Sequence, residues 1–571
     1  MKWLLIDGIG PFFPPRAAGK RVNWSKIPFH RIERDEVLDP ALFLQIRADF
    51  QKLAATAAQM GFNAITLDDV AHLAIHPDYP AEVRRKIDSY RAAYTCLCAD
   101  AAAAGLRVFL TTDVMFAHAS VQRKLRSLRR DAIPFLAEAC DQILDLFPQV
   151  AGIIARLGEC DGVDVEAAFP SRLAIKTPRD ARNLIDGLLP TFVRRERLLV
   201  LRTWTVGAYP IGDLMWHRKT FDQTFEGVDS PHFAISMKYG ETDFFRFLPL
   251  NKLFFRSRHQ KFIELQARRE YEGFGAYPSF VGWDYEAYLR ELATATNVIG
   301  GWVWCQTGGW GRFQNITFLR DSSVWNEINT FVTARLLKTG CTTESAVAQY
   351  CHERLPGAHE DQLLSLLRLS DEVIRELLYI DEFARRKLFF RRLRVPPLLA
   401  VYWDRILVNH GMRTLLRCFV QDGEQTIRQG HAALQKIRAM EAIAESLGLP
   451  AGDLRFQYDT FEIIAAVREF FFGPADADVL ERLTALKSRY KATYAVRYAV
   501  KMDLARFGVP HTRVRLLLRI MLRHQRGYRL LDRLVLIRLL AWLGPLLRLR
   551  EKTMLPSFAR KQAMGLHAVL R

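Results

Sequence analysis

Several features common in other protein classes are missing from this 571-residue sequence. The best candidate for a transmembrane helix, residues 534–549, is interrupted by two arginines and a proline, which exclude it. The N-terminal apolar run, residues 3–6, stops at Asp7 and is too short for the core of a secretory signal peptide. The eight cysteines follow neither a disulfide framework nor a zinc spacing, so we expect reduced thiols. Together these absences predict a cytoplasmic protein.

Motifs for cofactors and nucleic acids are also lacking. There is no phosphate-binding loop of the form GxxxxGK[ST] and no HExxH zinc motif, so we expect neither a cofactor nor a metal. The glycine-rich segment 307–313 follows the last predicted strand and opens no helix, so we interpret it as a rim loop. No nucleic-acid recognition motif is present, and nucleic acid is therefore not an expected partner.

The sequence does contain a regular alternation of short apolar runs and helical segments up to about residue 335. Half of the residues are hydrophobic and a quarter are charged, which is typical of a folded protein with sizeable cores. Several runs are apolar throughout, as in strands that are covered on both faces. Eight such units predict a (β/α)8 TIM barrel over residues 1–338. The eight runs are 2–6, 63–67, 107–112, 152–157, 198–204, 232–237, 261–266 and 298–304.

Strand signals largely stop after about residue 340. Helical periodicity and possible breaks, such as the Pro-Gly pair at 356–357, predict an all-helical C-terminal region over residues 339–571. The expected helical stretches are 343–354, 360–391, 395–420, 422–447, 457–472, 476–506 and 512–550.

Among the acidic residues that follow the predicted strands, three stand out. Glu159 follows the fourth run, Asp243 the sixth and Glu270 the seventh. Barrel active sites lie at the carboxyl ends of the strands, so these side chains should meet at the mouth. Paired carboxyl groups are what acid–base cleavage of a glycosidic bond requires. The pattern predicts a catalytic role for all three, although a single strand-end acid more often caps a helix or orients an arginine.

Aromatic residues at the same strand ends are suited to stacking on the apolar faces of a sugar ring. The candidates for substrate binding are Trp204, Tyr239, Trp304 and Trp310, and the alternative for such residues is packing at the end of the barrel. Basic residues lie beside the acids, with Arg156 close to Glu159 and Lys238 close to Asp243.

The segments SMKYGETDFFRFLPLNKLF and FIELQARREYEGFG resemble two motifs of the α-glucuronidases of glycoside hydrolase family sixty-seven. These motifs are Lys-Asn-Gly-Pro-x-Asp-Phe and Gln-x-x-x-Gln-Glu-Tyr, and their acids match Asp243 and Glu270. The segments GIIARLGECDG and RTWTVGAY are similar to two further family segments, the first of which carries an acid that matches Glu159. The resemblance covers about residues 1–355.

This resemblance implies an inverting exo-hydrolase that removes a terminal uronic acid, expected to be α-linked, from an acidic oligo- or polysaccharide. Glu159 would be the general acid, and Asp243 with Glu270 would hold and deprotonate the attacking water. Arg156, Arg202 and Lys238 fall at or next to positions that bind the uronic carboxylate in the family.

Departures from the family motifs keep alternatives open. The first motif reads Lys-Tyr-Gly-Glu, which adds Glu241 beside the site, and the second has no Gln before Glu270. A retaining mechanism with Glu159 and Glu270 as the carboxyl pair is one alternative. Another is a barrel that has lost catalysis and serves as a glycan-binding or scaffold protein in envelope polysaccharide metabolism.

The C-terminal residues 510–571 hold twelve arginines and two lysines against two acidic residues, and so carry most of the net charge of +19. A three- to four-residue spacing places six arginines in one stripe of a predicted helix, which is either a solvated face or a binding surface. The expected partners of such a surface are an anionic membrane, at its inner face, or an acidic protein. The stripe comprises Arg515, Arg519, Arg523, Arg526, Arg529 and Arg533.

Overall fold

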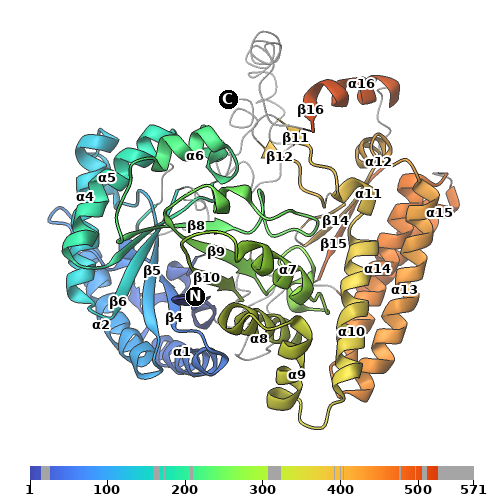
Figure 1. The fold of residues 1–571 in the computed structure, drawn as a ribbon, viewed down its shortest axis with the longest axis horizontal. Helices are drawn as coiled ribbons and strands as arrows, with labels where there is room; N and C mark the ends of the chain where they lie inside the picture. Colours follow the sequence, from blue (N-terminus) through green and yellow to red (C-terminus); the bar gives the residue numbers. More distant parts are fainter. Residues whose placement is uncertain are drawn as a thin grey trace.

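The computed structural model describes residues 1–13, 26–157, 168–170, 174–205, 210–305, 323–390, 393–398, 400–402, 404–474, 477–494, 497–504 and 511–524. Its first part is a closed barrel of eight parallel strands, in the order β1-β10-β9-β8-β7-β6-β5-β4 (Figure 1). The strands are β1 (Trp3–Asp7), β4 (Ala64–Asp68), β5 (Arg107–Asp113), β6 (Val150–Arg156), β7 (Leu198–Arg202), β8 (Phe233–Lys238), β9 (Gln260–Gln266) and β10 (Val298–Trp304). Each apolar run of the sequence corresponds to one strand, which confirms the predicted barrel.

Helices connect the strands and cover the outside of the barrel. In α1, Asp39 caps the N-terminus by accepting a hydrogen bond from the Ala41 amide at 2.9 Å, and Gly61 ends the helix with a left-handed φ of 100°. The other helices of this part are α2 (Ala81–Ala103), α3 (Ala119–Gln122), α4 (Ile133–Leu146), α5 (Pro178–Arg194), α6 (Arg218–Phe225), α7 (Gly282–Leu292) and α8 (Val324–Thr339), with α1 at Pro40–Met60 and a small hairpin of β2 (Glu33–Arg34) and β3 (Val37–Leu38).

Aromatic rings from alternate strands fill the lower part of the barrel. The rings of Trp3 and Phe109 are 5.1 Å apart, and those of Phe109 and Phe262 are 6.4 Å apart. Strands between them carry glycine at this level: a Cβ at Gly152 would lie 2.9 Å from the Phe109 ring, and one at Gly300 would lie 2.7 Å from the Phe262 ring. The barrel interior is thus a packed core whose upper end is left for polar side chains.

The C-terminal region packs beside the barrel as a group of helices, with α13 and α14 lying against each other (Figure 1). Its helices are α9 (Thr343–Arg354), α10 (Glu360–Val373), η8 (Ile374–Leu378), α11 (Asp381–Ala384), α12 (His410–Arg417), α13 (Gly423–Ser446), α14 (Ala451–Phe472), α15 (Ala477–Thr493) and α16 (His511–Met521). Among the described residues, no helix combines the length and the hydrophobicity that crossing a membrane requires.

The helical character of this region is confirmed, but it also contains two small sheets that the sequence reading missed. One has the order β12-β11-β16 and the other β13-β14-β15. Most of these strands are two residues long, and such short segments carry no periodicity that separates them from a helix. They are β11 (Phe389–Phe390), β12 (Leu393–Arg394), β13 (Val401–Tyr402), β14 (Arg405–Asn409), β15 (Ala499–Asp503) and β16 (Leu522–Arg523).

The predicted arginine stripe is interrupted by this arrangement. Helix α16 ends at Met521, and Arg523 pairs with Phe389 of β11 instead of continuing the helix. Arg515 and Arg519 are exposed on α16, whereas the last three arginines of the stripe lie outside the described residues. The single helix expected over 512–550 is therefore wrong at residues 522–523.

Candidate active site

The loops after β8 and β9 bring two of the three predicted catalytic acids together at the mouth of the barrel. The Tyr271 hydroxyl donates a hydrogen bond to Asp243 Oδ2 at 2.7 Å, and it also lies within hydrogen-bonding reach of the Glu270 carboxyl. Both acids are buried, with 8% of Asp243 and none of Glu270 exposed. Two carboxyl groups beside one hydroxyl form a pair whose protonation is mutually dependent.

Asp243 is held as an anion. Its Oδ1 atom receives the Lys238 ammonium at 2.5 Å and the Phe244 amide at 2.9 Å. Burial raises the pKa of the Asp243 carboxyl, but the charge and hydrogen bond of Lys238, together with the Tyr271 hydroxyl, outweigh burial and leave this pKa below its ordinary value.

Glu270, the second member of the pair, has a raised pKa where Asp243 has a lowered one. Its Oε2 atom accepts a hydrogen bond from Arg268 at 3.2 Å, and its backbone amide donates to Gln266 Oε1 at 2.9 Å. Burial and the neighbouring charge of Asp243 raise the pKa of Glu270 to about 7, although Arg268 and Lys238 oppose the shift. Two carboxyl groups with pKa values pushed apart in this way are typical of acid–base catalytic sites.

Lys238 joins the acidic pair to an aromatic surface. Its ammonium lies 3.4 Å from the centre of the Trp204 ring and 4.4 Å from that of Phe244. Trp204 follows β7 and is half-buried, so one part of its side chain remains accessible beside the carboxyl pair. Trp204, one of the predicted aromatic residues, thus lies in direct contact with the cation that pairs with Asp243.

Below the pair, Arg202 and Trp304 form the floor of the mouth around Glu264. Arg202 donates to Glu264 from Nε at 2.9 Å and from Nη2 at 2.7 Å, and the Trp304 indole donates at 3.3 Å. The Arg202 guanidinium also lies 4.9 Å from the centre of the Trp304 ring. Arg202 thus fixes a buried carboxylate, and its predicted contact with substrate stays a prediction.

The predicted residue Arg156 ends β6, the strand next to β7, where it pairs in register with Arg202, and its ion pairs are with acids of β5 and β4. Its Nε atom is 2.9 Å from Asp113 Oδ1, and its Nη2 atom is 3.4 Å from Asp68 Oδ1. Lys26 makes a second ion pair with Asp113. The mouth therefore has two charged halves, one built on β4–β6 and the other on β7–β10.

Two further residues named from the sequence, Tyr239 and Glu241, have their observed partners away from the carboxyl pair. The Tyr239 ring packs in the layer between β8 and α7, 4.9 Å from the Tyr288 ring, and its hydroxyl donates to the Phe245 carbonyl at 2.7 Å. It is a core residue because adjacent strand residues point to opposite faces, and Lys238 occupies the inner one. Glu241 pairs with Lys387 of the C-terminal region and so turns away from the mouth.

Glu159 and Trp310, the remaining predicted site residues, lie outside the described residues. Their predicted roles stay predictions.

Among the buried polar atoms at the mouth, three from β9, β10 and the loop after β9 have no hydrogen-bond partner within the described part of the chain. They are Glu270 Oε1, Gln266 Nε2 and Trp302 Nε1. Leaving such atoms unpaired costs free energy, so they mark positions where a bound polar molecule gains hydrogen bonds. One acceptor and two donors are suited to the hydroxyl groups of a sugar.

Sequence reasoning missed Glu264 and Gln266 as members of the site. A signal was available for them, because both are polar residues of β9, on either side of Leu265, and so share one face. Within the ranges that the structure describes, no group of three or more His, Cys, Asp and Glu side chains is arranged to hold a metal ion.

Comparisons with known proteins identify the fold. No family model and no curated protein matches the sequence. Among solved structures, the chain is similar to a GH138 enzyme targeting pectin rhamnogalacturonan II, with a TM-score of 0.51 and 10% sequence identity over 87% of this chain. The match spans 62% of that enzyme's length. CpGH84B, at 10% identity, matches 79% of this chain and 69% of its own with a TM-score of 0.37. The chain thus shares a barrel fold with a glycoside hydrolase.

Proposed function

We propose that this protein is a glycoside hydrolase whose catalytic site contains Asp243 and Glu270. The observation that carries the proposal is the buried pair of carboxyl groups from consecutive barrel strands, joined through Tyr271 and differing in pKa. The similarity in fold to a glycoside hydrolase supports the same class of reaction. The unpaired donors of Gln266 and Trp302 add positions that hold sugar hydroxyls.

In the proposed inverting reaction, Glu270 is the general base. A base with a pKa near neutral pH removes a proton from water most effectively, and Glu270 meets this condition. Asp243 stays ionised, orients the water through the remaining lone pair of Oδ2 and stabilises the positive charge that develops on the sugar. Glu159 protonates the leaving oxygen. The bond from the anomeric carbon to that oxygen breaks as the bond to water forms, which inverts the anomeric centre.

The finer proposal concerns the sugar, a terminal α-linked uronic acid. It is supported by the cations that converge on the mouth, namely Arg156, Arg202 and Lys238. Each of them already has a carboxylate partner, so an acidic sugar binds by sharing these cations. We therefore expect a preference for uronides that is moderate, about tenfold in kcat/KM over the neutral sugar.

The first experiment is a screen with 4-nitrophenyl α- and β-uronides and the matching neutral glycosides. Hydrolysis of an α-uronide, with product of inverted configuration by NMR, supports the proposal in full. A product of retained configuration would show a retaining instead of an inverting mechanism, and the protein would still be a glycoside hydrolase. If the protein binds acidic oligosaccharides but hydrolyses none of these substrates, the glycan-binding alternative is favoured.

Substitution tests the assignment of the pair. Asp243→Asn and Glu270→Gln keep the size of each side chain, and each should lower kcat by about 10²- to 10⁴-fold. Asp180→Asn, in the capping box of α5, is a matched control that removes a carboxylate from the barrel without touching the mouth. Full activity in either site variant contradicts the proposal.

A further inference from the structure

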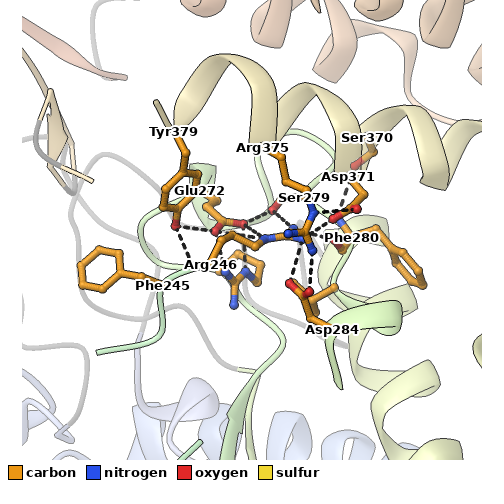
Figure 2. Close-up of polar contacts among 12 residues, drawn as sticks. Phe245, Arg246, Glu272, Ser279, Phe280, Asp284, Ser370, Asp371, Arg375 and Tyr379 are labelled. Atoms are coloured by element: carbon orange, nitrogen blue, oxygen red, sulfur yellow. Dashed lines mark hydrogen bonds and ion pairs between the residues drawn. The ribbon is translucent and has the colours of Figure 1, made fainter. Parts of the chain in front are cut away.

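A second group of charged residues lies immediately beyond the carboxyl pair, where the barrel meets the C-terminal region. Figure 2 shows Arg246 at its centre, surrounded by Glu272, Asp284 and Asp371. Arg246 follows Asp243 by three residues, and Glu272 follows Glu270 by two. The two loops that carry the proposed catalytic acids therefore continue directly into this cluster.

Arg246 is buried, and its donors are directed to several elements at once. Its Nε lies 3.3 Å from Glu272 Oε2, and its Nη1 lies 3.3 Å from Asp284 Oδ2. A further ion pair joins Nη1 to Asp371 of α10, and Nη2 donates to the Phe280 carbonyl at 2.5 Å. One side chain thus connects the loops after β8 and β9 to α7 and to the C-terminal region.

The Tyr379 hydroxyl holds the two loops together. It accepts a hydrogen bond from the backbone amide of Arg246 at 3.2 Å and donates one to Glu272 Oε1 at 2.8 Å (Figure 2). Tyr379 follows η8 in the C-terminal region and is fully buried. A single oxygen atom from outside the barrel is therefore bonded to both loops.

The cluster is balanced in charge. Arg246, Arg269 and Arg375 face three carboxylates, and Arg269 donates to Glu272 from Nη2 at 2.5 Å. Burial raises the pKa of Glu272, but Arg246 and Arg269 outweigh burial and hold this pKa well below its ordinary value. Glu272 therefore stays ionised at neutral pH, and its carboxylate is fixed by Arg246 and Arg269.

Backbone geometry shows that these loops need external support. Phe247 has a φ of 60° and Arg269 a φ of 51°, both in the left-handed region that residues with a Cβ rarely adopt. Such a conformation is unfavourable and persists only when the surrounding structure holds the residue in place. Phe247 follows Arg246, and Arg269 precedes Glu270, so the unfavourable conformations flank the carboxyl pair.

We propose that the C-terminal region acts in the reaction of the barrel, with Tyr379 and Asp371 as positioning residues that set the separation of Asp243 and Glu270 through Arg246 and Glu272. This inference rests on the proposed function and adds to it a role for residues more than 100 positions away in sequence. Tyr379 does not touch the substrate. It acts by fixing the two loops relative to each other.

The test is Tyr379→Phe, which removes the bridging oxygen and keeps the ring that packs 5.6 Å from Phe247. We expect kcat to fall about 10- to 100-fold, with KM changed less than about twofold, because misplacement of reacting groups affects the transition state most. Tyr90→Phe is the matched control: its buried hydroxyl also donates to a glutamate, Glu33, at 3.0 Å, but on the far side of the barrel. Equal activity of the two variants overturns the proposal.

A second measurement needs no substrate. The pKa of Glu270 depends on the charged groups that face it, Asp243, Arg268 and Lys238, and on the hydroxyl of Tyr271. The melting temperature is measured from pH 4 to 9 for the parent protein and for its Glu270→Gln variant, and again for both in the Tyr379→Phe background. In each background, the two curves of melting temperature against pH separate where Glu270 loses its proton. If Tyr379 positions the pair, this separation pH differs between the two backgrounds.

The combined outcomes separate the two proposals. An unchanged separation pH in the Tyr379→Phe background overturns the positioning role. A changed separation pH in a protein that cleaves no glycoside supports positioning and rejects the hydrolase. Asp371→Asn, which weakens the link to Arg246 without removing the bridging hydroxyl, should give a smaller change in the same direction, and no change in this variant removes Asp371 from the proposal.

Discussion

At the scale of the residue, Glu270 is the buried carboxyl group whose raised pKa suits it to acid–base catalysis. It is fully buried and adjacent to an ionised carboxylate, and its pKa is raised to about 7. As the proposed general base it must be ionised, so we expect kcat/KM to rise with pH and to level off above about pH 7. A pH–rate profile measures this. A rate that falls above pH 7 would instead identify Glu270 as the proton donor.

The raised pKa of Glu270 also predicts a dependence of stability on pH. The native protein binds this proton more tightly than the unfolded chain, so the group favours folding below about pH 4.5 and this contribution is lost as the pH rises through about 7. Glu270→Gln removes the buried charge and should raise the free energy of unfolding by on the order of 2 kcal/mol at pH 8, but not at pH 4. Denaturant unfolding at both pH values checks this.

Glu327→Gln provides the matched control for that stability measurement. Burial also raises the pKa of Glu327, in α8, so its substitution should stabilise the protein at high pH. Glu327 is not part of the mouth, and its variant should keep full activity. A stabilised but inactive Glu270→Gln beside a stabilised and active Glu327→Gln would separate function from stability.

At the scale of the element, β10 depends on a glycine. A Cβ at Gly300 would lie 2.4 Å from the Trp3 carbonyl oxygen and 2.7 Å from the Phe262 ring, and the carbonyl belongs to the neighbouring strand β1. Gly300→Ala should therefore lower the free energy of unfolding by about 2–3 kcal/mol. Gly452→Ala in α14 meets no atom within 4 Å and should be neutral or stabilising by at most about 1 kcal/mol. Similar unfolding curves for both variants would contradict this packing.

The loops after β8 and β9 are the elements that sequence reasoning handled least well. Their acids were placed correctly at strand ends, but the partners of those acids come from elsewhere in the chain. Glu241 and Glu272 sit in the same motifs as Asp243 and Glu270, yet they pair with the C-terminal region. Because the four carboxylates are so close in sequence, their positions do not show which two face the mouth and which two face the C-terminal region.

At the scale of the whole molecule, the barrel and the C-terminal region are joined by buried polar contacts as well as by packing. In addition to the Arg246 cluster, the Trp325 indole of α8 donates to Asp453 of α14 at 2.8 Å. Gln457 of α14 is buried and donates to the carbonyl of Pro278, which lies between β9 and α7, at 3.3 Å. Such contacts leave unpaired buried groups if either part is removed.

The basic C-terminus leads to a prediction for the intact protein. We expect the full chain to float with vesicles that contain anionic lipid at low salt, and to lose this binding as salt rises, because the arginines act through long-range charge. A chain truncated after residue 510 should not bind, while neutral vesicles provide the control for nonspecific adsorption. Salt-insensitive flotation would point to an apolar contact instead.

The sequence by itself determined the barrel, because strands that are buried on both faces consist mostly of apolar residues. Each of the eight runs can therefore be recognised without knowing which strands lie beside it. The sequence also determined that acids stand at the strand ends. Tertiary structure alone decided which acids form the pair. The charge state of Glu270 depends on Asp243, Lys238 and Arg268, and their distances are set when distant loops are held by residues such as Tyr379. Electrostatic interactions depend on separation in space and on burial, and a linear sequence records neither.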